Sequence, residues 1–131
     1  MTKDCHMLEH KIQSRGIARA QTLLTKDQIL TAIPNGGLRD TVTASKLKSE
    51  GVLPGMPDLL LLVPNKRFVA SWTEVKTKTG AVSPEQKNIL RILREARHTC
   101  PHCGHSSPSF QINVARNEDE IFNQTKEYLE S

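Results

Sequence analysis

The spacing of apolar and small residues predicts helices in the first part of the chain. Residues 6–24 repeat them at helical intervals and so define a stripe along one helix face. The stripe consists of Leu8, Ile12, Gly16, Ala20 and Leu23. Its small members favour close packing against a neighbouring element. A second helix is predicted from about 41 to 50, where Asp40 can cap the start and Gly51 the end.

Three short stretches predict strands. Residues 58–63 contain five consecutive apolar residues after an aspartate, which is typical of a strand buried on both faces. Residues 68–76 are rich in aromatic and β-branched residues and form the next strand, after a turn at 64–67. Residues 110–115 form the third strand. We expect a turn at 31–39, because Pro-Asn-Gly-Gly breaks any helix.

Two capping sequences mark the later helices and complete the fold prediction. Ser83 suits a helix N-cap, Pro84 suits the first helical position and Gln86 completes a capping box, so a helix runs to about residue 97. Asn117 caps a last helix that ends near residue 129. The order α-α-β-β-α-β-α predicts an α/β fold, a mixed β-sheet flanked by helices, in one domain of 131 residues.

Composition narrows the classes of function. The net charge of +4 favours a polyanionic partner, and with 4% aromatic residues the chain is poorly suited to stacking nucleobases. The sequence has no apolar run of membrane-spanning length and no signal-peptide core near its start, so we expect no membrane association. Three cysteines, an odd number, argue against a disulfide framework and indicate a reducing, cytoplasmic setting.

The candidate chemistry lies at the ends of the first two predicted strands. Glu74 and Lys76 point to the same face of one strand and Asp58 opens its neighbour, so two carboxylates and one ammonium group converge. Two carboxylates can hold Mg²⁺, which accepts phosphate oxygens and lowers the pKa of a bound water. A lysine stabilises charge on the phosphate. The backbone carbonyl of Val75 is a further candidate metal ligand.

The same spacing also arises by chance, usually as solvated strand ends. Here Asp58 and Glu74 adjoin strongly apolar strands, where an unpaired charge is costly. This context favours a site for phosphodiester hydrolysis.

Six short motifs together give the sequence a family resemblance. They are EHKIQ at 9–13, IPNGGLR at 33–39, KSEGV at 48–52, GMPD at 55–58, EVK at 74–76 and SPEQ at 83–86. Their order and spacing resemble the VRR-NUC domain, a virus-type replication-repair nuclease domain found alone in phages and prophages, within the PD-(D/E)xK nuclease superfamily. The resemblance covers residues 9 to about 129 and implies a restriction-endonuclease-like core.

The resemblance also implies roles for individual residues. Asp58 and Glu74 would bind Mg²⁺ or Mn²⁺, and Lys76 would be the catalytic lysine. Glu9 would be a further acidic residue reaching the metal, the alternative being a solvated helix residue. Gln86 would be an auxiliary active-site residue, the alternative being helix capping alone.

Several residues are candidates for contacts with DNA. The backbone amides at Asn35, Gly36 and Gly37 and the guanidinium of Arg39 suit phosphate, although the same segment also fits a plain turn. Further candidate cations are Lys48 and Lys78, followed by Lys46, Lys87, Arg91 and Arg94. Most surface charges of this kind are simply solvated.

We expect a loop at residues 98–109, and this insertion interrupts the resemblance. It contains HTCPHCGH at 98–105, and Cys-x-x-Cys followed by glycine resembles a zinc knuckle. A tetrahedral Zn²⁺ site could be formed by Cys100, Cys103 and two of the three histidines. We expect these to be His98 and His105 in preference to His102. Alternatively, two protomers could share one ion. A second Cys-x-x-Cys is missing, so a loop with reduced thiols is the alternative.

The resulting hypothesis is a metal-dependent DNA endonuclease. Because stand-alone members of the family resemble junction-resolving enzymes, we expect four-way (Holliday) junctions as substrate and a homodimer as the active form. The alternatives are a nuclease for flaps, nicks or duplex ends, and a non-catalytic protein that binds DNA through the cysteine-rich loop. The intact set of Asp58, Glu74 and Lys76 favours an enzyme, since a pure binding protein would not need it.

Overall fold

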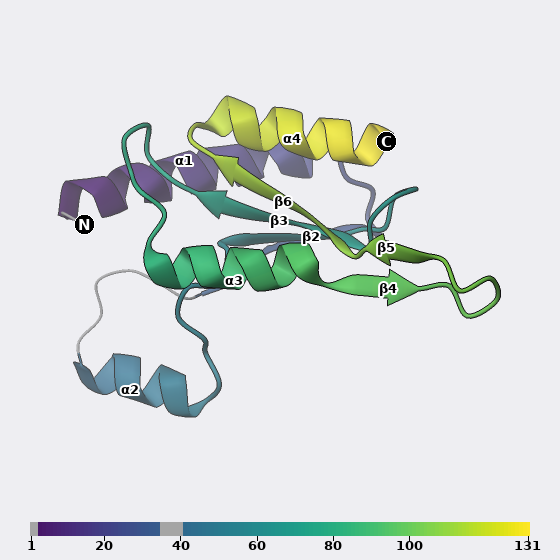
Figure 1. The fold of residues 1–131 in the computed structure, drawn as a ribbon. Helices are drawn as coiled ribbons and strands as arrows, with labels where there is room; N and C mark the ends of the chain where they lie inside the picture. Colours follow the sequence, from purple (N-terminus) through teal and green to yellow (C-terminus); the bar gives the residue numbers. More distant parts are fainter. Residues whose placement is uncertain (1–2, 35–40) are drawn as a thin grey trace.

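Helices pack on both faces of a four-stranded mixed sheet. The computed structural model describes residues 3–34 and 41–131, and its sheet contains, in spatial order, β1 (Ile29–Ala32), β2 (Leu59–Leu62), β3 (Ala70–Val75) and β6 (Phe110–Ala115). β2 is antiparallel to both β1 and β3, whereas β6 is parallel to β3. α1 (Lys3–Gln21) and α4 (Glu118–Glu130) lie together on one face and α3 (Pro84–Glu95) on the other (Figure 1). This arrangement confirms the predicted α/β class.

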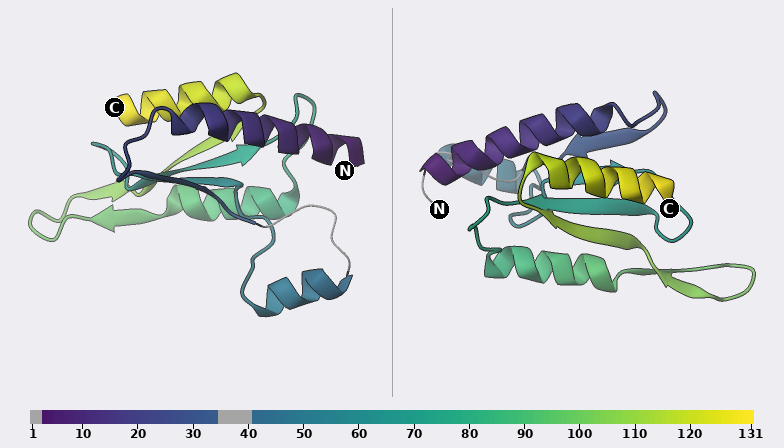
Figure 2. Two further views of the ribbon diagram at one scale, coloured as in Figure 1. Left: turned by 180° about the vertical axis from the view of Figure 1, so that it is seen from behind. Right: turned by 90° about the horizontal axis from the view of Figure 1, so that it is seen from above.

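Two elements stand outside the layered core. α2 (Thr41–Ser49) projects away from the sheet, and β4 (Arg97–Thr99) and β5 (Ser106–Pro108) form an antiparallel hairpin beyond the end of α3 (Figure 1 and Figure 2). The backbone N–H of Ser109 donates to the carbonyl of Ala96 at 2.9 Å, which closes the base of the hairpin. The chain therefore re-enters the sheet directly at β6.

The structure corrects two of the sequence-based predictions. The expected turn at 31–39 is wrong at its start, because residues 31 and 32 belong to β1, an edge strand with three of its four residues exposed. Such a strand shows no alternation of apolar and polar residues in the sequence. It is defined by its hydrogen bonds to β2. The expected loop at 98–109 is also wrong, since it contains the β4–β5 hairpin, whose two polar three-residue strands pair only with each other.

The other predicted helices and strands are confirmed, and their ends differ from the predicted ends by a few residues. The predicted cap at Ser83 is present as a full capping box, and the side chain of Asn117 accepts the N–H of Glu120. The predicted cap at Asp40 lies outside the described residues.

A close contact between α1 and α4 fixes one side of the core. Gly16 and Ala20 of the predicted stripe are buried, and a Cβ at Gly16 would lie 2.3 Å from Cδ1 of Ile121. Glycine at this position lets α4 approach α1. Ala20 and Ile121 belong to one buried cluster with Leu59 of β2 and Val75 of β3, so the helix pair supports the strands that carry the candidate site.

Gly16→Ala should therefore lower the free energy of unfolding, although alanine is the better helix former by about 1 kcal/mol. Rotation of the Ile121 side chain cannot relieve the clash, because its Cβ would also lie 2.9 Å from the new methyl group. Overpacking of this kind costs about 1–3 kcal/mol.

The matched control is Ala18→Gly at an exposed position of the same helix. It should cost about 1 kcal/mol through helix propensity alone. Urea unfolding measures both variants, and a Gly16→Ala protein more stable than wild type would contradict the close α1–α4 contact.

Candidate active site

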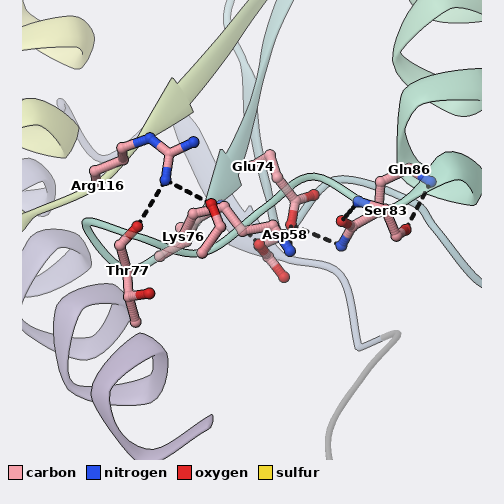
Figure 3. Close-up of polar contacts among 9 residues, drawn as sticks. Asp58, Glu74, Lys76, Thr77, Ser83, Gln86 and Arg116 are labelled. Atoms are coloured by element: carbon pink, nitrogen blue, oxygen red, sulfur yellow. Dashed lines mark hydrogen bonds and ion pairs between the residues drawn. The ribbon is translucent and has the colours of Figure 1, made fainter. Parts of the chain in front are cut away.

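β2 and β3 bring the three predicted catalytic residues to one end of the sheet. Asp58 immediately precedes β2, Glu74 lies in β3 and Lys76 follows β3 directly (Figure 3). The antiparallel register of the two strands sets Asp58 beside Glu74. The Oδ2 atom of Asp58 accepts a hydrogen bond from the backbone N–H of Val75 at 2.7 Å, which fixes this carboxyl group against β3.

The side chains of Glu74 and Lys76 are buried beside each other. Each side chain is 2% exposed, and Lys76 Nζ lies 3.9 Å from Glu74 Oε1. The backbone N–H of Lys76 donates to the carbonyl of Ala115 at 2.9 Å, which extends the pairing of β3 with β6 beyond the end of the strand. The position of Lys76 is therefore fixed by backbone pairing and does not depend on its side-chain contacts.

Burial of two facing carboxyl groups raises the pKa of both. Burial raises the pKa of Asp58 above its usual range, against the opposing effect of the Val75 N–H. Burial raises the pKa of Glu74 to about 9, with further contributions from the charge of Asp58 and the hydrogen bond between the two carboxyl groups, while Lys76 opposes the shift. In the absence of a cation the pair of carboxyl groups therefore retains a proton at neutral pH.

The carboxyl groups fit a divalent cation. Glu74 Oε2 is buried and has no hydrogen-bond partner within the described part of the chain. Mg²⁺ and Mn²⁺ prefer oxygen ligands. A bound divalent cation would also offset the repulsion between the two carboxylates when both are ionised. Nowhere in residues 8–34 and 42–131 do three His, Cys, Asp or Glu side chains gather closely enough to hold a metal. Asp58 and Glu74 would therefore share the ion with backbone, water or phosphate oxygens.

An open cleft of about 460 Å³ adjoins this cluster. It is lined by Glu9, Lys76, Thr77, Gly80, Ala81, Ser83 and Gln86. Glu9 reaches the cleft from α1, and its charge makes a further, smaller contribution to the raised pKa of Glu74. Thr77 Oγ1 is buried and lacks a hydrogen-bond partner among the described residues, a feature that no sequence pattern indicated.

Gln86 connects the start of α3 to the carboxyl groups. The side-chain Oε1 of Gln86 accepts the backbone N–H of Ser83 at 2.9 Å, and the backbone N–H of Gln86 donates to Ser83 Oγ at 3.1 Å. These two bonds form the capping box. Its Nε2 donates to Glu74 Oε1 at 3.1 Å (Figure 3). The two interpretations of Gln86 from the sequence are thus compatible, because its amide oxygen caps the helix while its amide nitrogen orients Glu74.

Arg116 holds the loop that follows Lys76, and sequence reasoning missed it. Its Nη1 donates to the carbonyls of Thr77 and Gly80 at 2.7 Å each, and to that of Lys78 at 3.4 Å (Figure 3). The loop forms one wall of the cleft, so Arg116 positions that wall beside the ammonium group. Finding it requires the parallel pairing of β3 and β6, which places residue 116 beside the end of β3.

The predicted DNA-contact residues that the structure describes are exposed and lie on different elements. Residues 35–37 and Arg39 lie outside the described residues. Lys78 is exposed on the cleft loop, whereas Lys48 is exposed on α2. The other candidates, Lys46, Lys87, Arg91 and Arg94, are also exposed.

No helix in the described residues is long and apolar enough to cross a membrane.

The predicted zinc ligands lie elsewhere, on the β4–β5 hairpin. Cys100 and Cys103 are at its tip as free thiols. His98 and His105 line a separate depression along its length.

Comparison with known proteins identifies the family to which this fold belongs. The family model of the VRR-NUC domain matches residues 2–106, that is 105 of the 131 residues, and the chain belongs to this family. A solved structure of a VRR-NUC domain protein is similar in fold, with a TM-score of 0.69 at 18% identity over 93% of this chain and 88% of the other. A search of curated proteins finds no match. The resemblance identified from the six motifs is confirmed.

Glu74→Gln should stabilise the metal-free protein by several degrees. Glutamine keeps an acceptor for Gln86, donates to Asp58 and removes the cost of ionising a buried carboxyl group. Because the pKa of Glu74 is raised from 4.5 to about 9, the unfolded chain releases this proton at lower pH than the folded chain. Wild-type stability therefore falls as pH rises through that window, and the advantage of the variant should widen, as measured by thermal unfolding in chelator.

Addition of Mg²⁺ or Mn²⁺ provides the complementary measurement for Glu74→Gln. The ion should raise the melting temperature of the wild type and leave that of the variant almost unchanged, because one of its two carboxylate ligands is gone. Equal stabilisation of both proteins would place the ion elsewhere.

Arg116→Ala should loosen the cleft wall. We expect a loss of about 2 kcal/mol in the free energy of unfolding from the broken charged hydrogen bonds. Cleavage of bound DNA should slow by about 10–100-fold, because the reacting groups are then less well positioned.

Arg116→Lys should give an intermediate result, since an ammonium can donate to both carbonyls, as Nη1 does, but stands at the end of a shorter side chain. Arg15→Ala, an exposed change on α1, is the control and should alter neither quantity. Single-turnover cleavage measures the rate. A destabilised variant with unchanged cleavage would limit Arg116 to a role in folding.

Proposed function

We propose that this protein is a metal-dependent DNA endonuclease that hydrolyses phosphodiester bonds at Asp58, Glu74 and Lys76. The observation that carries the proposal is the convergence of two carboxyl groups and a buried ammonium group beside an open cleft. Burial of these charges lowers the stability of the fold, which favours a catalytic over a structural role. Membership of a nuclease family supports the same conclusion.

Each residue has a distinct task in this proposal. Asp58 and Glu74 would hold Mg²⁺ or Mn²⁺, with the carbonyl of Val75 as a further candidate ligand. Glu9 lines the adjoining cleft, and its carboxylate would have to move closer to the other two to bind the same ion. A divalent ion bound there supplies a water of lowered pKa and neutralises charge on the phosphate. Lys76, held in place by its backbone, stabilises the negative charge that develops on the phosphate oxygens. Gln86 keeps the Glu74 carboxylate oriented through its amide nitrogen.

Exposed basic residues support DNA as the polyanion. Lys78 stands on the loop that forms the cleft wall, and Lys48 is exposed on the projecting helix α2. Neutralisation of phosphates by such cations supplies most of the sequence-independent affinity for DNA. The net charge of +4 has the matching sign.

We further infer that the substrate is a four-way junction and that the active form is a homodimer. Each chain offers one set of Asp58, Glu74 and Lys76, and one set cuts one strand at a time. Resolution of a junction needs two cuts in strands related by its symmetry. A two-fold dimer, the commonest oligomer, supplies two centres in a matching arrangement.

Lys76→Met should slow cleavage by at least about 10²–10³-fold and leave DNA binding nearly unchanged. Methionine keeps most of the buried stem of the side chain and removes its charge. The assay uses labelled four-way junctions, flaps, nicked duplexes and blunt duplexes with Mg²⁺ or Mn²⁺. Lys26→Met, at an exposed position near the opposite end of β2 from Asp58, is the matched control and should cleave like the wild type.

The same panel separates the alternatives. Paired nicks in the junction, with a dimer mass by light scattering, would support the junction assignment. Faster cleavage of flaps or duplex ends by a monomer would favour the other nuclease specificity. Near-normal cleavage by Lys76→Met would exclude this site, and binding without cleavage with either metal would favour a non-catalytic DNA-binding protein.

A further inference from the structure

The β4–β5 hairpin carries a second group of reactive side chains that the proposed nuclease chemistry does not use. Its segment 98–105 contains two cysteines and three histidines. Thr99 pairs with Ser106, and the N–H of Cys100 donates to the carbonyl of His105 at 2.8 Å, so the strands stay in register up to the tip. The hairpin projects beyond the sheet, at the opposite end of α3 from Gln86 (Figure 1).

The tip has a backbone conformation suited to binding a metal through sulfur. Gly104 has φ = 76°, a conformation that glycine adopts without strain, and its N–H donates to the carbonyl of Cys100 at 2.9 Å. The turn directs the backbone N–H groups of His102 and Cys103 at the sulfur of Cys100. Thiolates are the metal-binding form of cysteine, and donated N–H groups stabilise them.

Strand alternation places two imidazoles on the same face as the first thiol. Cys100 is directly opposite His105 and two residues after His98, and residues in these relations share a hairpin face. Both imidazoles are exposed and line one depression of about 330 Å³. In the metal-free conformation His98 Nδ1 lies 3.3 Å from Ser109 Oγ, and no three candidate ligands within the described residues are assembled. Metal binding at the tip therefore requires the exposed imidazoles to rotate toward the sulfurs.

We propose that the hairpin tip binds one Zn²⁺ ion per chain through Cys100, Cys103, His98 and His105. Two thiolates and two imidazoles form a tetrahedral set that favours Zn²⁺ over the oxygen-seeking Mg²⁺. His102 lies in the turn between the two cysteines, outside the paired positions that relate His98 and His105 to Cys100, and is not part of the assigned ligand set.

The test measures metal content and ligand type without DNA, so its outcome is independent of the proposed nuclease activity. Protein purified without chelator should contain one zinc per chain by elemental analysis. After replacement by Co²⁺, the absorption spectrum should show tetrahedral d–d bands and a charge-transfer band with the intensity of two thiolates. Cys100→Ser and Cys103→Ser should abolish binding, and His98→Asn and His105→Asn should each weaken Co²⁺ binding by at least about 10-fold.

Matched controls are Cys5→Ser, which changes the one cysteine outside the hairpin, and His10→Asn, at an exposed position of α1. Both should bind Co²⁺ like the wild type. Circular dichroism of every variant separates loss of metal from loss of fold. The histidine variants keep both thiols, so they test the ligand set with a smaller perturbation of the hairpin than the cysteine variants. Zinc-free protein, or full binding by Cys100→Ser, would overturn the proposal. One ion per two chains with four thiolates would overturn the assigned ligand set in favour of an ion shared between copies.

Discussion

The removal of two carboxyl groups and one ammonium group from water, at one end of the sheet, is the constraint on which the rest of the structure depends. Glu74 and Lys76 are each 2% exposed, so neighbouring groups must replace the water that would otherwise solvate them. Asp58 takes the N–H of Val75, and Glu74 takes the amide of Gln86. Strands β2 and β3 and helix α3 thus each contribute a polar contact to one small volume. Glu74 Oε2 stays without a partner among the described groups, so one oxygen of the cluster is left to accept a ligand from outside the described residues.

The connection from β3 through α3 to the parallel strand β6 explains why these contacts meet where they do. In such a crossover the helix begins beside the carboxyl end of the first strand, which is where α/β sheets commonly bind ligands. Gln86, in the first turn of α3, therefore meets Glu74 near the end of β3. The parallel partner β6 ends at the same edge, so Arg116 reaches the carbonyls of the loop after Lys76. A helix cap and a strand end thereby become parts of the candidate site without any dedicated element.

Features encoded over a few neighbouring residues could be predicted from the sequence. The apolar run that forms β2, the capping box of α3 and the small residue at Gly16 each rest on local chemistry, and the structure contains all of them. The convergence of Asp58 with Glu74 and Lys76 could be inferred because strand alternation and adjacency suffice. β1 could not, because an exposed edge strand depends on its partner more than on its own side chains. Arg116 could not either, since its contacts join segments brought together only by the β3–β6 pairing.

The position of the hairpin explains how an insertion is accommodated without disturbing the carboxyl cluster. It leaves α3 at the end opposite Gln86, and the bond from Ser109 to Ala96 closes its base. β6 therefore begins at Phe110 in register with Ala70, as it would after a short turn. The hairpin has three pairs of mostly polar residues and packs no face into the core clusters, and an isolated two-stranded hairpin of this kind is only marginally stable in water. Cross-linking of its two strands at the tip by a metal ion would supply the rigidity that its small polar strands do not provide, which gives the cysteine and histidine residues a physical purpose separate from phosphodiester hydrolysis.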